Sequence, residues 1–464
     1  MKNLFEMKKL YNSYIVLFAI VFFSCENTPF DELNTDPTKL REVNLELMLP
    51  EVIASSMYNE GTAGPRAIGI FMQQFIGLDA QQLDYTQYVV STDILNNHWR
   101  TGFYAGVLRS CDVMIKQAQE EKAPFYEAVG KVVMANQYGI NTSYFGDMPF
   151  TEALQGLDNF QPKYDSQEAI YAGAIILLDE AITILSGKPT GYLGGDLIYN
   201  GDASKWLKTA RALKARFLIH QSKRNPSNFA AALTELGASY ASIEEQSDFQ
   251  FGTALTANYS LAKFGIDRPS TLGIDPRFAA MMEGDPRRMK YMFQDEAKTW
   301  QYFSSVDTIN VKLSYSKNDA VIPMISFAEV KFMEAEALLE TEGDPAAALK
   351  AAIVASFVQC GAQGGEAYAE NVIAGGVDKK TIITEAYKAY YGTAFHETWV
   401  NYRRTGFPAL VAHPNGANGS NPSGVVPRRF LYPESEYQSN LSNVKAAEAA
   451  QGGSLQDVAL WAFE

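Results

Sequence analysis

Amphipathic helical segments follow one another in pairs along this chain, and they leave few folds open to it. In the clearest pair, apolar residues recur every three or four positions over residues 171–185 and again over residues 206–217. That spacing predicts two helices, each with one buried face. Trp206 lies on the apolar face of the second helix, so we expect its ring in the core.

Polar residues at the expected starts of the helices support these boundaries. Asp165 followed by Glu168, and Ser326 followed by Glu329, fit the capping-box pattern, in which the first side chain accepts a backbone N–H from the first turn. Asp202 is a favourable N-cap for the second helix of the first pair. These residues therefore predict where three of the helices begin.

Another pair of helices is predicted over residues 93–119 and 124–144, with Trp99 and Phe103 four positions apart on a packing face. Helix pairs joined by short turns are typical of tetratricopeptide-like repeats. The pairs here are unevenly spaced and match the repeat consensus poorly. We therefore expect a mainly α fold, with a degenerate tetratricopeptide-like helix-pair scaffold that buries its core between neighbouring pairs.

Two long segments interrupt the helical pattern, near residues 246–317 and 411–427. The first mixes Phe, Tyr, Trp, Pro and Gly without a helical period, and its aromatic content argues against disorder. Loops of this length inside a compact protein commonly carry function. We predict that these insertions form an irregular, loop-rich lobe on the helical scaffold.

The N-terminus has the organisation of a secretory signal. Two lysines precede an uncharged apolar run at residues 14–23, which is too short to span a bilayer as a helix. The run ends in Ser24-Cys25, and a small residue before a cysteine is typical of bacterial lipoprotein signals. We predict that residues 1–24 are removed and that Cys25 becomes the acylated N-terminus.

An ordinary secreted protein, in which Cys25 is incidental, remains the alternative for this segment. Met7 fits the start of such a signal better than Met1 does. Residues 25–43 are polar and punctuated by proline, which predicts a flexible tether. The folded domain is then expected over residues 44–464. Several acyl chains on one cysteine would hold it stably at a membrane.

The acidic charge of the chain restricts its partners. The formal net charge is -14, and removal of residues 1–24, which carry a net charge of +2, would leave -16. Such a surface repels the phosphate backbone, so no nucleic-acid partner is expected. Apart from Cys25, the cysteines are Cys111 and Cys360, which are far apart and flanked by apolar residues. They are interpreted as buried free thiols.

The sequence carries no recognisable catalytic, metal or cofactor motif. His396-Glu397 resembles the start of a zinc-binding H-E-x-x-H motif, but Val400 stands where the second histidine would be required. No CxxC pair, Walker A loop, G-x-G-x-x-G or G-x-S-x-G motif occurs. Among 53 acidic residues a catalytic carboxylate pair cannot be picked out from sequence. We predict no cofactor, no metal site and no enzymatic activity.

Aromatic residues in irregular segments are the best candidates for ligand contacts. Aromatic faces suit sugar rings, whose C–H groups form an apolar patch. Trp300 and Tyr302 lie in the irregular segment, next to Lys298, Thr299 and Gln301, while Tyr85 and Tyr88 lie in a polar stretch after the first helices. We predict that these four aromatic residues bind the ligand.

Several segments together resemble the SusD/RagB family of outer-membrane lipoproteins. They are residues 397–408 (ETWVNYRRTGFP), 427–437 (PRRFLYPESEY), 146–153 (GDMPFTEA) and 196–202 (DLIYNGD). The resemblance extends over essentially the whole chain after the signal segment. Within these motifs, Arg403 or Arg404, and likewise Arg428 or Arg429, are predicted to pair with Glu397.

The resemblance implies a function and a partner. Members of the family are surface-exposed lipoproteins of the outer membrane that capture a nutrient, most often a glycan, for a TonB-dependent, SusC-like transporter. The ligand contacts of the family follow no motif, so the resemblance transfers regions rather than residues. It points to the loop after the first helix and to the irregular middle segment, which contain the four aromatic candidates.

Three other functions remain open from the sequence. A lipid-anchored helical glycoside hydrolase would need two carboxylates converging in a cleft. A peptide-binding relative of RagB would share the fold and the anchor. A structural repeat protein would organise other proteins and would have no ligand pocket between its repeats and its irregular lobe.

Overall fold

The computed structural model describes residues 43–59, 62–190 and 193–464. The chain divides into two units, residues 1–44 and 45–464, and every helix and strand named below belongs to the second. The predicted signal segment and the predicted lipid anchor Cys25 lie outside the described residues. Almost all of the predicted tether also lies outside them.

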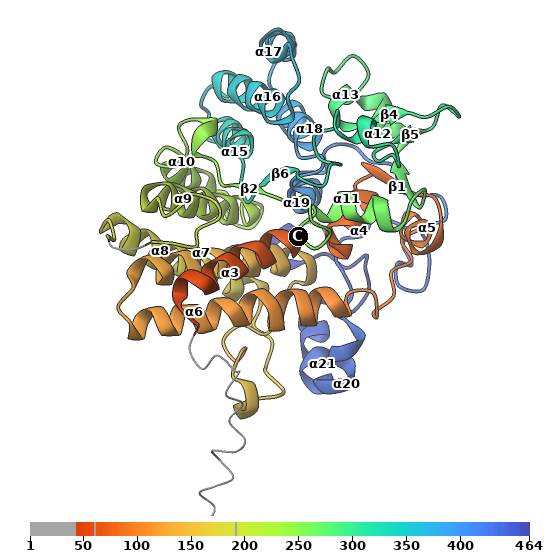
Figure 1. Cartoon of the computed structure of the whole chain (residues 1–464). Helices are drawn as coiled ribbons and strands as arrows, with labels where there is room; N and C mark the ends of the chain where they lie inside the picture. Colours follow the sequence, from red (N-terminus) through yellow and green to blue (C-terminus); the bar gives the residue numbers. More distant parts are fainter. Residues whose placement is uncertain (1–42, 60–61, 191–192) are drawn as a thin grey trace, which may run out of the picture. The chain divides into compact units, whose positions relative to one another are not determined.

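Successive helices pack against one another to form the scaffold of the second unit (Figure 1). α6 contacts α7, and the chain of contacts continues through α8, α9, α10 and α15 to α16. The predicted mainly α fold is confirmed, whereas its tetratricopeptide-like detail remains a prediction. The bounds of these helices are α6 (Arg109–Glu120), α7 (Pro124–Phe145), α8 (Gln167–Ser186), α9 (Ala203–His220), α10 (Asn228–Leu236), α15 (Phe327–Glu340) and α16 (Ala346–Cys360).

Two of the three predicted N-caps are confirmed. Asp202 accepts the backbone N–H groups of residues 204 and 205, and Ser326 accepts that of Glu329. The third prediction is wrong, because α8 is capped by Ser166, which accepts the N–H of Ala169. The carboxylate of Asp165 instead accepts the N–H groups of residues 150 and 151 and so closes the preceding turn.

Trp206, Trp99 and Phe103 are all buried, as their helical spacing predicts. The indole N–H of Trp206 donates to Asp196 at 2.8 Å, and its ring meets that of Tyr199 edge-on. Cys111 and Cys360 are free and buried, as predicted. Helical periodicity therefore identified core side chains correctly.

Charged residues of the scaffold pair inside the core, but not as the motif predicted. Glu397 accepts a hydrogen bond from His220 at 2.9 Å, whereas Arg404 forms a two-pronged ion pair with Glu336. Arg403 donates to backbone carbonyl oxygens and stacks on Trp399. The predicted pairing of these arginines with Glu397 is therefore wrong, because Arg404 pairs with a carboxylate on α15 and Arg403 donates to backbone carbonyl groups.

Arg429 likewise takes no part in a pair with Glu397. It is fully buried, and its guanidinium donates to the backbone carbonyl oxygens of Phe430 and Phe145. Arg428 is exposed, and its backbone N–H donates to the carbonyl oxygen of Gln456. A guanidinium with several donors satisfies carbonyl groups that no helix or strand pairs.

Arg216 is a fully buried charge of the scaffold. Its side chain is fully buried and donates to both carboxylate oxygens of Glu329, at 2.6 and 2.9 Å. It also donates to the side chain of Asn136 and to the carbonyl oxygen of Met324. The ion pair thus joins α9, α7 and α15 through one guanidinium.

A group of four rings joins segments from both ends of the second unit. Phe71, Tyr144, Trp399 and Phe430 pack with ring centroids 5.1–6.1 Å apart. Trp399 belongs to α19 (Phe395–Thr405), and its indole N–H donates to the carbonyl oxygen of Pro427. We call these four residues the ring cluster.

The N-terminal helices of this unit lie across the scaffold. α3 (Leu45–Asn59) contacts α6, α7 and a π-helix, η1 (Asn97–Leu108), that leads directly into α6. A π-helix, with i to i+5 hydrogen bonds, is rare at such a length and is frequent at functional sites in shorter form. Between α3 and η1 come α4 (Ala63–Phe71), β1 (Phe75–Gly77) and α5 (Ala80–Thr86).

The predicted irregular segment at residues 246–317 forms short strands and short helices. β2 pairs with β6, β1 with β3, and β4 with β5, all antiparallel. In Figure 1 the β1, β4 and β5 strands lie together with α12 and α13, away from α8 and α9. The elements are β2 (Asp248–Gln250), α11 (Ser260–Asp267), β3 (Leu272–Ile274), α12 (Pro276–Met281), α13 (Arg288–Tyr291), β4 (Phe293–Gln294), β5 (Trp300–Gln301), α14 (Asp307–Asn310) and β6 (Val321–Pro323).

The C-terminal part returns to both the scaffold and the N-terminal helices. α18 contacts α15 and α16, and α19 contacts α4. Residues 411–427 contain no helix and only one isolated bridge, between Asn418 and Asn421. The remaining elements are α17 (Gly365–Ala374), α18 (Lys379–Ala389), α20 (Glu434–Ser439), α21 (Leu441–Ala450) and the 3₁₀ turns η2 (Gly156–Asp158), η3 (Ile243–Glu245) and η4 (Trp461–Phe463).

One helix of the described residues, α8, is long and apolar enough to cross a membrane by length and composition alone. It packs between α7 and α9, and its buried face includes Tyr171, Leu178 and Leu185. A core helix of a globular domain has the same composition, so these properties carry little weight for a membrane span.

Candidate functional site

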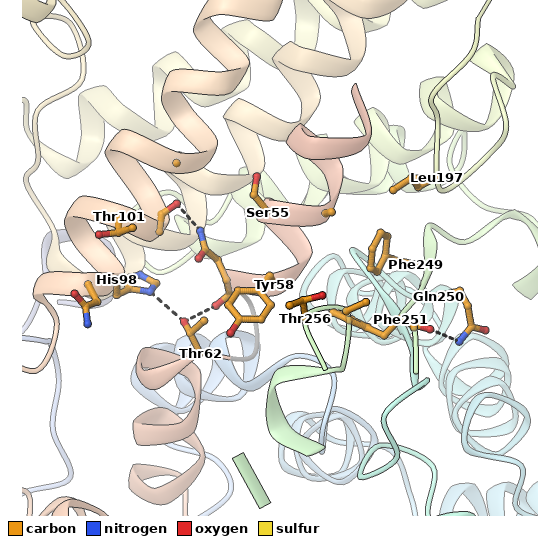
Figure 2. A pocket seen from close by; sticks show the side chains of 17 residues that line it. Ser55, Tyr58, Thr62, His98, Thr101, Leu197, Phe249, Gln250, Phe251 and Thr256 are labelled. Carbon is orange, nitrogen blue, oxygen red and sulfur yellow. Dashed lines mark hydrogen bonds between the residues drawn. The ribbon is translucent and has the colours of Figure 1, made fainter. Parts of the chain in front are cut away.

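A cavity of about 990 Å³ lies where α3, η1 and the segment after β2 meet. Ligand cavities of proteins typically measure about 300–1,000 Å³, so this one can hold a molecule larger than a single small metabolite. It is lined by Ala54, Ser55, Tyr58, Asn59, Thr62, Asn97, His98, Thr101, Gly102, Gly106, Leu197, Phe249, Gln250, Phe251, Gly252, Thr256 and Ala257. In Figure 2, His98, Thr62 and Thr101 lie to one side and Phe249 and Phe251 to the other.

The π-helix explains which of its residues face the cavity. With i to i+5 hydrogen bonds, positions four and five residues apart come to lie on one face. Asn97, Thr101, Gly102 and Gly106 follow this spacing and line the cavity. Residues on the opposite face, among them Trp99 and Phe103, are buried in the core.

Close approach of α3 to η1 forms the polar side of the cavity. The amide of Asn59 donates to the carbonyl oxygen of Gly102 at 2.7 Å. A Cβ at Gly102 would stand 2.6 Å from the Asn59 Oδ1 atom, so a larger residue here would force the Asn59 side chain to move. The hydroxyl of Thr62 donates to the carbonyl oxygen of Asn59 and extends the same wall.

His98 is held in a defined orientation on this wall. Its Nε2 atom lies 2.7 Å from the Asn141 Oδ1 atom, while the Asn141 amide donates to the carbonyl oxygen of Gln137. Since the Asn141 oxygen is an acceptor, Nε2 carries the proton and Nδ1 is left as an acceptor. Burial lowers the pKa of His98 below its ordinary value of 6.5, so the ring is neutral near pH 7.

The opposite side of the cavity is apolar. Phe249 and Phe251 meet edge-on with their centroids 4.9 Å apart, and the pairing of Phe249 with Ile322 fixes the strand that carries them. Leu197 and Tyr58 add to this surface, and 42% of Tyr58 is exposed. The cavity therefore offers an apolar wall opposite hydrogen-bonding groups, an arrangement that suits a sugar ring.

The four aromatic residues predicted from sequence do not line this cavity. Trp300 is half-buried in the β4–β5 hairpin, and the guanidinium of Arg288 lies over its ring at 4.0 Å. That cation occupies one face of the ring in the way a ligand would. A ligand contact at Trp300 remains a prediction.

Tyr85 and Tyr302 both lie inside the core, each no more than 2% exposed. Both lie near the guanidinium of Arg66, and the ring of Tyr302 meets that of Phe75 at 5.4 Å. Burial raises the pKa of both hydroxyls, and Arg66 opposes that rise. In this conformation neither ring offers a free face for stacking.

Tyr88 holds the long C-terminal loop in place. Its hydroxyl accepts the backbone N–H of His413, and the amide of Asn418 donates to its carbonyl oxygen. A Cβ at Gly416 would stand 2.6 Å from the Tyr88 ring, which shows how closely the loop packs on it. Tyr88 is 2% exposed, and the contacts that surround its ring come from the protein itself.

Sequence reasoning missed the residues that line the cavity, although one signal was available for Tyr58. The buried side chains of α3 recur every three or four positions and include Leu45, Leu49, Val52, Ile53 and Met57. Tyr58 falls outside that stripe, and a large aromatic residue off the buried face of a helix is a candidate for binding. No comparable signal marks Phe249, whose short strand alternates buried and accessible positions over three residues only.

Across the described residues, no group of three or more His, Cys, Asp or Glu side chains is placed to hold a metal ion. A mainly helical scaffold that carries an amphipathic cavity of this size has the organisation of a binding protein. The comparisons with known proteins place it in a particular family.

A family model of SusD-like proteins, described as starch-binding and associating with the outer membrane, matches residues 37–433. The chain belongs to this SusD-like family. Members of the family are outer-membrane nutrient-binding proteins rather than enzymes, so the predicted class of protein is confirmed. No curated protein sequence matches the chain.

Solved structures with the same fold span almost the whole chain. A SusD/RagB family protein from Bacteroides thetaiotaomicron is 22% identical, with a TM-score of 0.76 over 91% of this chain and 99% of that one. A SusD homologue from Bacteroides uniformis is 19% identical, with a TM-score of 0.76 over 90% of this chain and 99% of that one. A chitin-binding SusD homologue from Flavobacterium johnsoniae is 18% identical, with a TM-score of 0.74 over 90% and 98%.

Proposed function

We propose that this protein is a surface-exposed lipoprotein that binds a glycan in the cavity between α3, η1 and β2, and that it delivers the glycan to a SusC-like, TonB-dependent transporter. The observation that carries the proposal is the cavity itself, with rings of Tyr58, Phe249 and Phe251 facing hydrogen-bonding side chains of η1. The starch-binding description of the family and the chitin-binding relative support a glycan as the ligand.

The chemistry of the cavity also separates this proposal from a hydrolase. Glycoside hydrolysis uses two carboxyl groups that flank the scissile bond. None of the described residues that line the cavity is Asp or Glu. What they supply is ring faces and neutral hydrogen-bonding groups, which hold a sugar without activating water or the glycosidic oxygen.

Replacement of Tyr58 by alanine should weaken glycan binding without unfolding the protein. Tyr58 is the most accessible large ring at the cavity, and a stacked ring contributes about 0.5–1.5 kcal/mol beyond its buried area. With the lost contact area included, we expect affinity to fall roughly tenfold. Calorimetric titration with maltooligosaccharides and chito-oligosaccharides, together with a melting curve, measures both effects.

Two further variants test whether the ligand binds in the cavity or at another surface. Phe160→Ala removes another exposed ring, which is 69% accessible and does not line the cavity, and should leave binding unchanged. Trp300→Ala tests the site predicted from sequence, where loss of affinity would put the ligand at the β4–β5 hairpin. Unchanged affinity in Tyr58→Ala, with a loss in Trp300→Ala, would contradict the cavity as the binding site.

Membrane attachment is expected to depend on Cys25. Cys25→Ala should release the protein from membranes or leave its signal segment uncleaved, because the acylated thiol is the proposed anchor. The measurement is fractionation of cells followed by mass determination of the N-terminus. The same membrane preparation, solubilised in mild detergent, should yield the wild-type protein together with a TonB-dependent barrel protein. Retention of Cys25→Ala in membranes after cleavage at another residue would refute the anchor.

A further inference from the structure

The described residues that line the cavity include no Asp, Glu, Lys or Arg. One residue in five of the whole chain is charged, so 17 described lining residues without any charged side chain are a clear departure from its composition. Thr101 lies on the exposed surface of η1 and still presents only a hydroxyl to the cavity. A charged ligand group that packs against these residues would lose water without gaining an ionic partner among them.

Among the described residues that line the cavity, His98 is the one whose charge can change near neutral pH, and it is held neutral. The rings of Tyr144 and Phe145 pack around it, and Asn141 is its polar partner on α7. Burial lowers the pKa of His98, and the hydrogen bond with Asn141 only partly opposes this effect. No charged side chain is among the groups that shift its pKa.

The fixed tautomer of His98 gives this wall a hydrogen-bond acceptor, which favours a ligand group that donates a hydrogen bond. Because Nε2 donates to Asn141, the Nδ1 atom presents a lone pair on the Thr62 side (Figure 2). The hydroxyl of Thr62 lies 3.5 Å from Nδ1 and gives its proton to the carbonyl oxygen of Asn59, which is closer at 2.9 Å. A ligand hydroxyl or amide N–H can therefore donate to Nδ1 more strongly than Thr62 does.

We infer that the cavity selects an uncharged sugar, which stacks on Tyr58 and donates a hydrogen bond to the Nδ1 atom of His98. The inference rests on the proposed function. It adds the chemical class of the ligand and names His98 as a residue that recognises it. A uronic acid, an amino sugar with a free ammonium group and a free peptide with charged termini are excluded on the same ground. Each would place an unpaired charge between apolar rings and neutral hydrogen-bonding groups.

Matched pairs of oligosaccharides test the charge selection directly. Chito-oligosaccharides are compared with the same chains after deacetylation, at a pH where the amines that deacetylation exposes are protonated to ammonium groups. Oligogalacturonates are compared with their neutral methyl esters. With the full-length lipoprotein in detergent, neutral members should bind at least about tenfold more tightly than their charged counterparts, since an unsatisfied buried polar group already costs this much. Equal binding of both members of each pair overturns the inference and leaves the proposed function standing, whereas no binding of any member overturns both.

A change of charge at the cavity wall provides the second test. Thr101→Asp places a carboxylate at an exposed position of the lining and should raise the affinity for the deacetylated chain about tenfold or more while lowering that for the neutral one. Thr234→Asp, on the exposed face of α10 and outside the lining, is the matched control and should change neither affinity. If Thr101→Asp leaves both affinities unchanged, the ligand does not reach this wall and the inference is wrong.

The role of His98 is separated from a structural one by its pH profile. Neutral-sugar affinity of the wild type should stay constant between about pH 8 and pH 6.5 and fall only at lower pH, because protonation turns the Nδ1 acceptor into a donor. His98→Phe should lower the affinity roughly tenfold and abolish this acid limb, and Tm is measured alongside to confirm that the variant folds. An acid limb that persists unchanged in a folded His98→Phe protein overturns the assignment of His98.

Discussion

Arg216→Met is expected to destabilise the protein by about 3–5 kcal/mol, because it leaves the carboxylate of Glu329 buried without its partner. Arg216 has no exposed side-chain surface and Glu329 almost none, so water cannot replace the lost hydrogen bonds. Glu397 lies within 3.6 Å of the same guanidinium and would also lose this nearby positive charge, while keeping its hydrogen bond from His220. Urea unfolding at neutral pH measures the loss.

The stability of this variant is also expected to change with pH in a defined direction. Burial and the nearby Glu397 raise the pKa of Glu329, and Arg216 opposes them, so removing Arg216 raises that pKa further. A carboxyl group whose pKa is higher in the folded state than in the unfolded state binds protons preferentially on folding. Arg216→Met should therefore recover part of its lost stability as the pH falls from roughly 8 to roughly 5.

Two controls show that the effect belongs to a buried ion pair. Arg216→Met combined with Glu329→Gln removes both charges and should be more stable than the single variant, since no unpaired charge remains. Lys263→Met breaks the ion pair with Asp267 on the surface of α11 and should cost no more than about 1 kcal/mol. If Arg216→Met lowers the free energy of unfolding as little as Lys263→Met does, Arg216 and Glu329 do not form a buried ion pair.

Trp206→Ala is expected to cost about 3–5 kcal/mol, which is a large part of the stability of a typical protein. The ring is fully buried, and its loss leaves a cavity between α9 and the turn that contains Tyr199. It also removes the N–H that donates to Asp196, whose carboxylate accepts three backbone N–H groups of the same turn. Thermal and urea unfolding of the variant measure the cost.

Trp206→Phe separates packing from hydrogen bonding at this position. It keeps an aromatic ring but cannot donate to Asp196, so it should lose clearly less stability than Trp206→Ala. Glycan affinity of whatever fraction folds should equal that of the wild type, because Trp206 does not line the cavity. A Trp206→Ala protein that unfolds at the same urea concentration as the wild type would contradict the packing of this helix.

The helical scaffold could be predicted from sequence because its signals are local. Repeats of three and four residues identified Trp206 and Phe103 as core, and single polar residues identified two N-caps. The predicted N-cap at Asp165 was wrong because its carboxylate accepts the N–H of Phe150 instead. That contact depends on a segment 15 residues earlier in the chain, which the local pattern around Asp165 does not include. The predicted ion pairs were wrong for the same reason, since Arg404 pairs with Glu336, which lies 68 residues away in the sequence.

The candidate site was harder to predict. Aromatic residues in segments without helical periodicity were expected to be accessible to a ligand, but most of them are buried. Trp300 begins the short strand β5 and Tyr302 directly follows it, and both rings pack against the core. The cavity itself joins residues near 55, 100 and 250, and no local pattern connects them. The absence of charged side chains among its described lining residues is visible only once these segments are brought together.

The ring cluster has a consequence for the order in which this chain can fold. Phe71 meets Trp399 and Phe430 directly, so the centre of the domain closes a loop of more than 300 residues. Contacts between such distant residues form slowly, since the entropy of closing the loop is lost before the contacts stabilise it. A chain that emerges from its N-terminus onwards can bring Tyr88 to Phe71 early, but Phe71 lacks its Trp399 and Phe430 contacts until residue 430 is available. The last quarter of the sequence controls when the first helices become native.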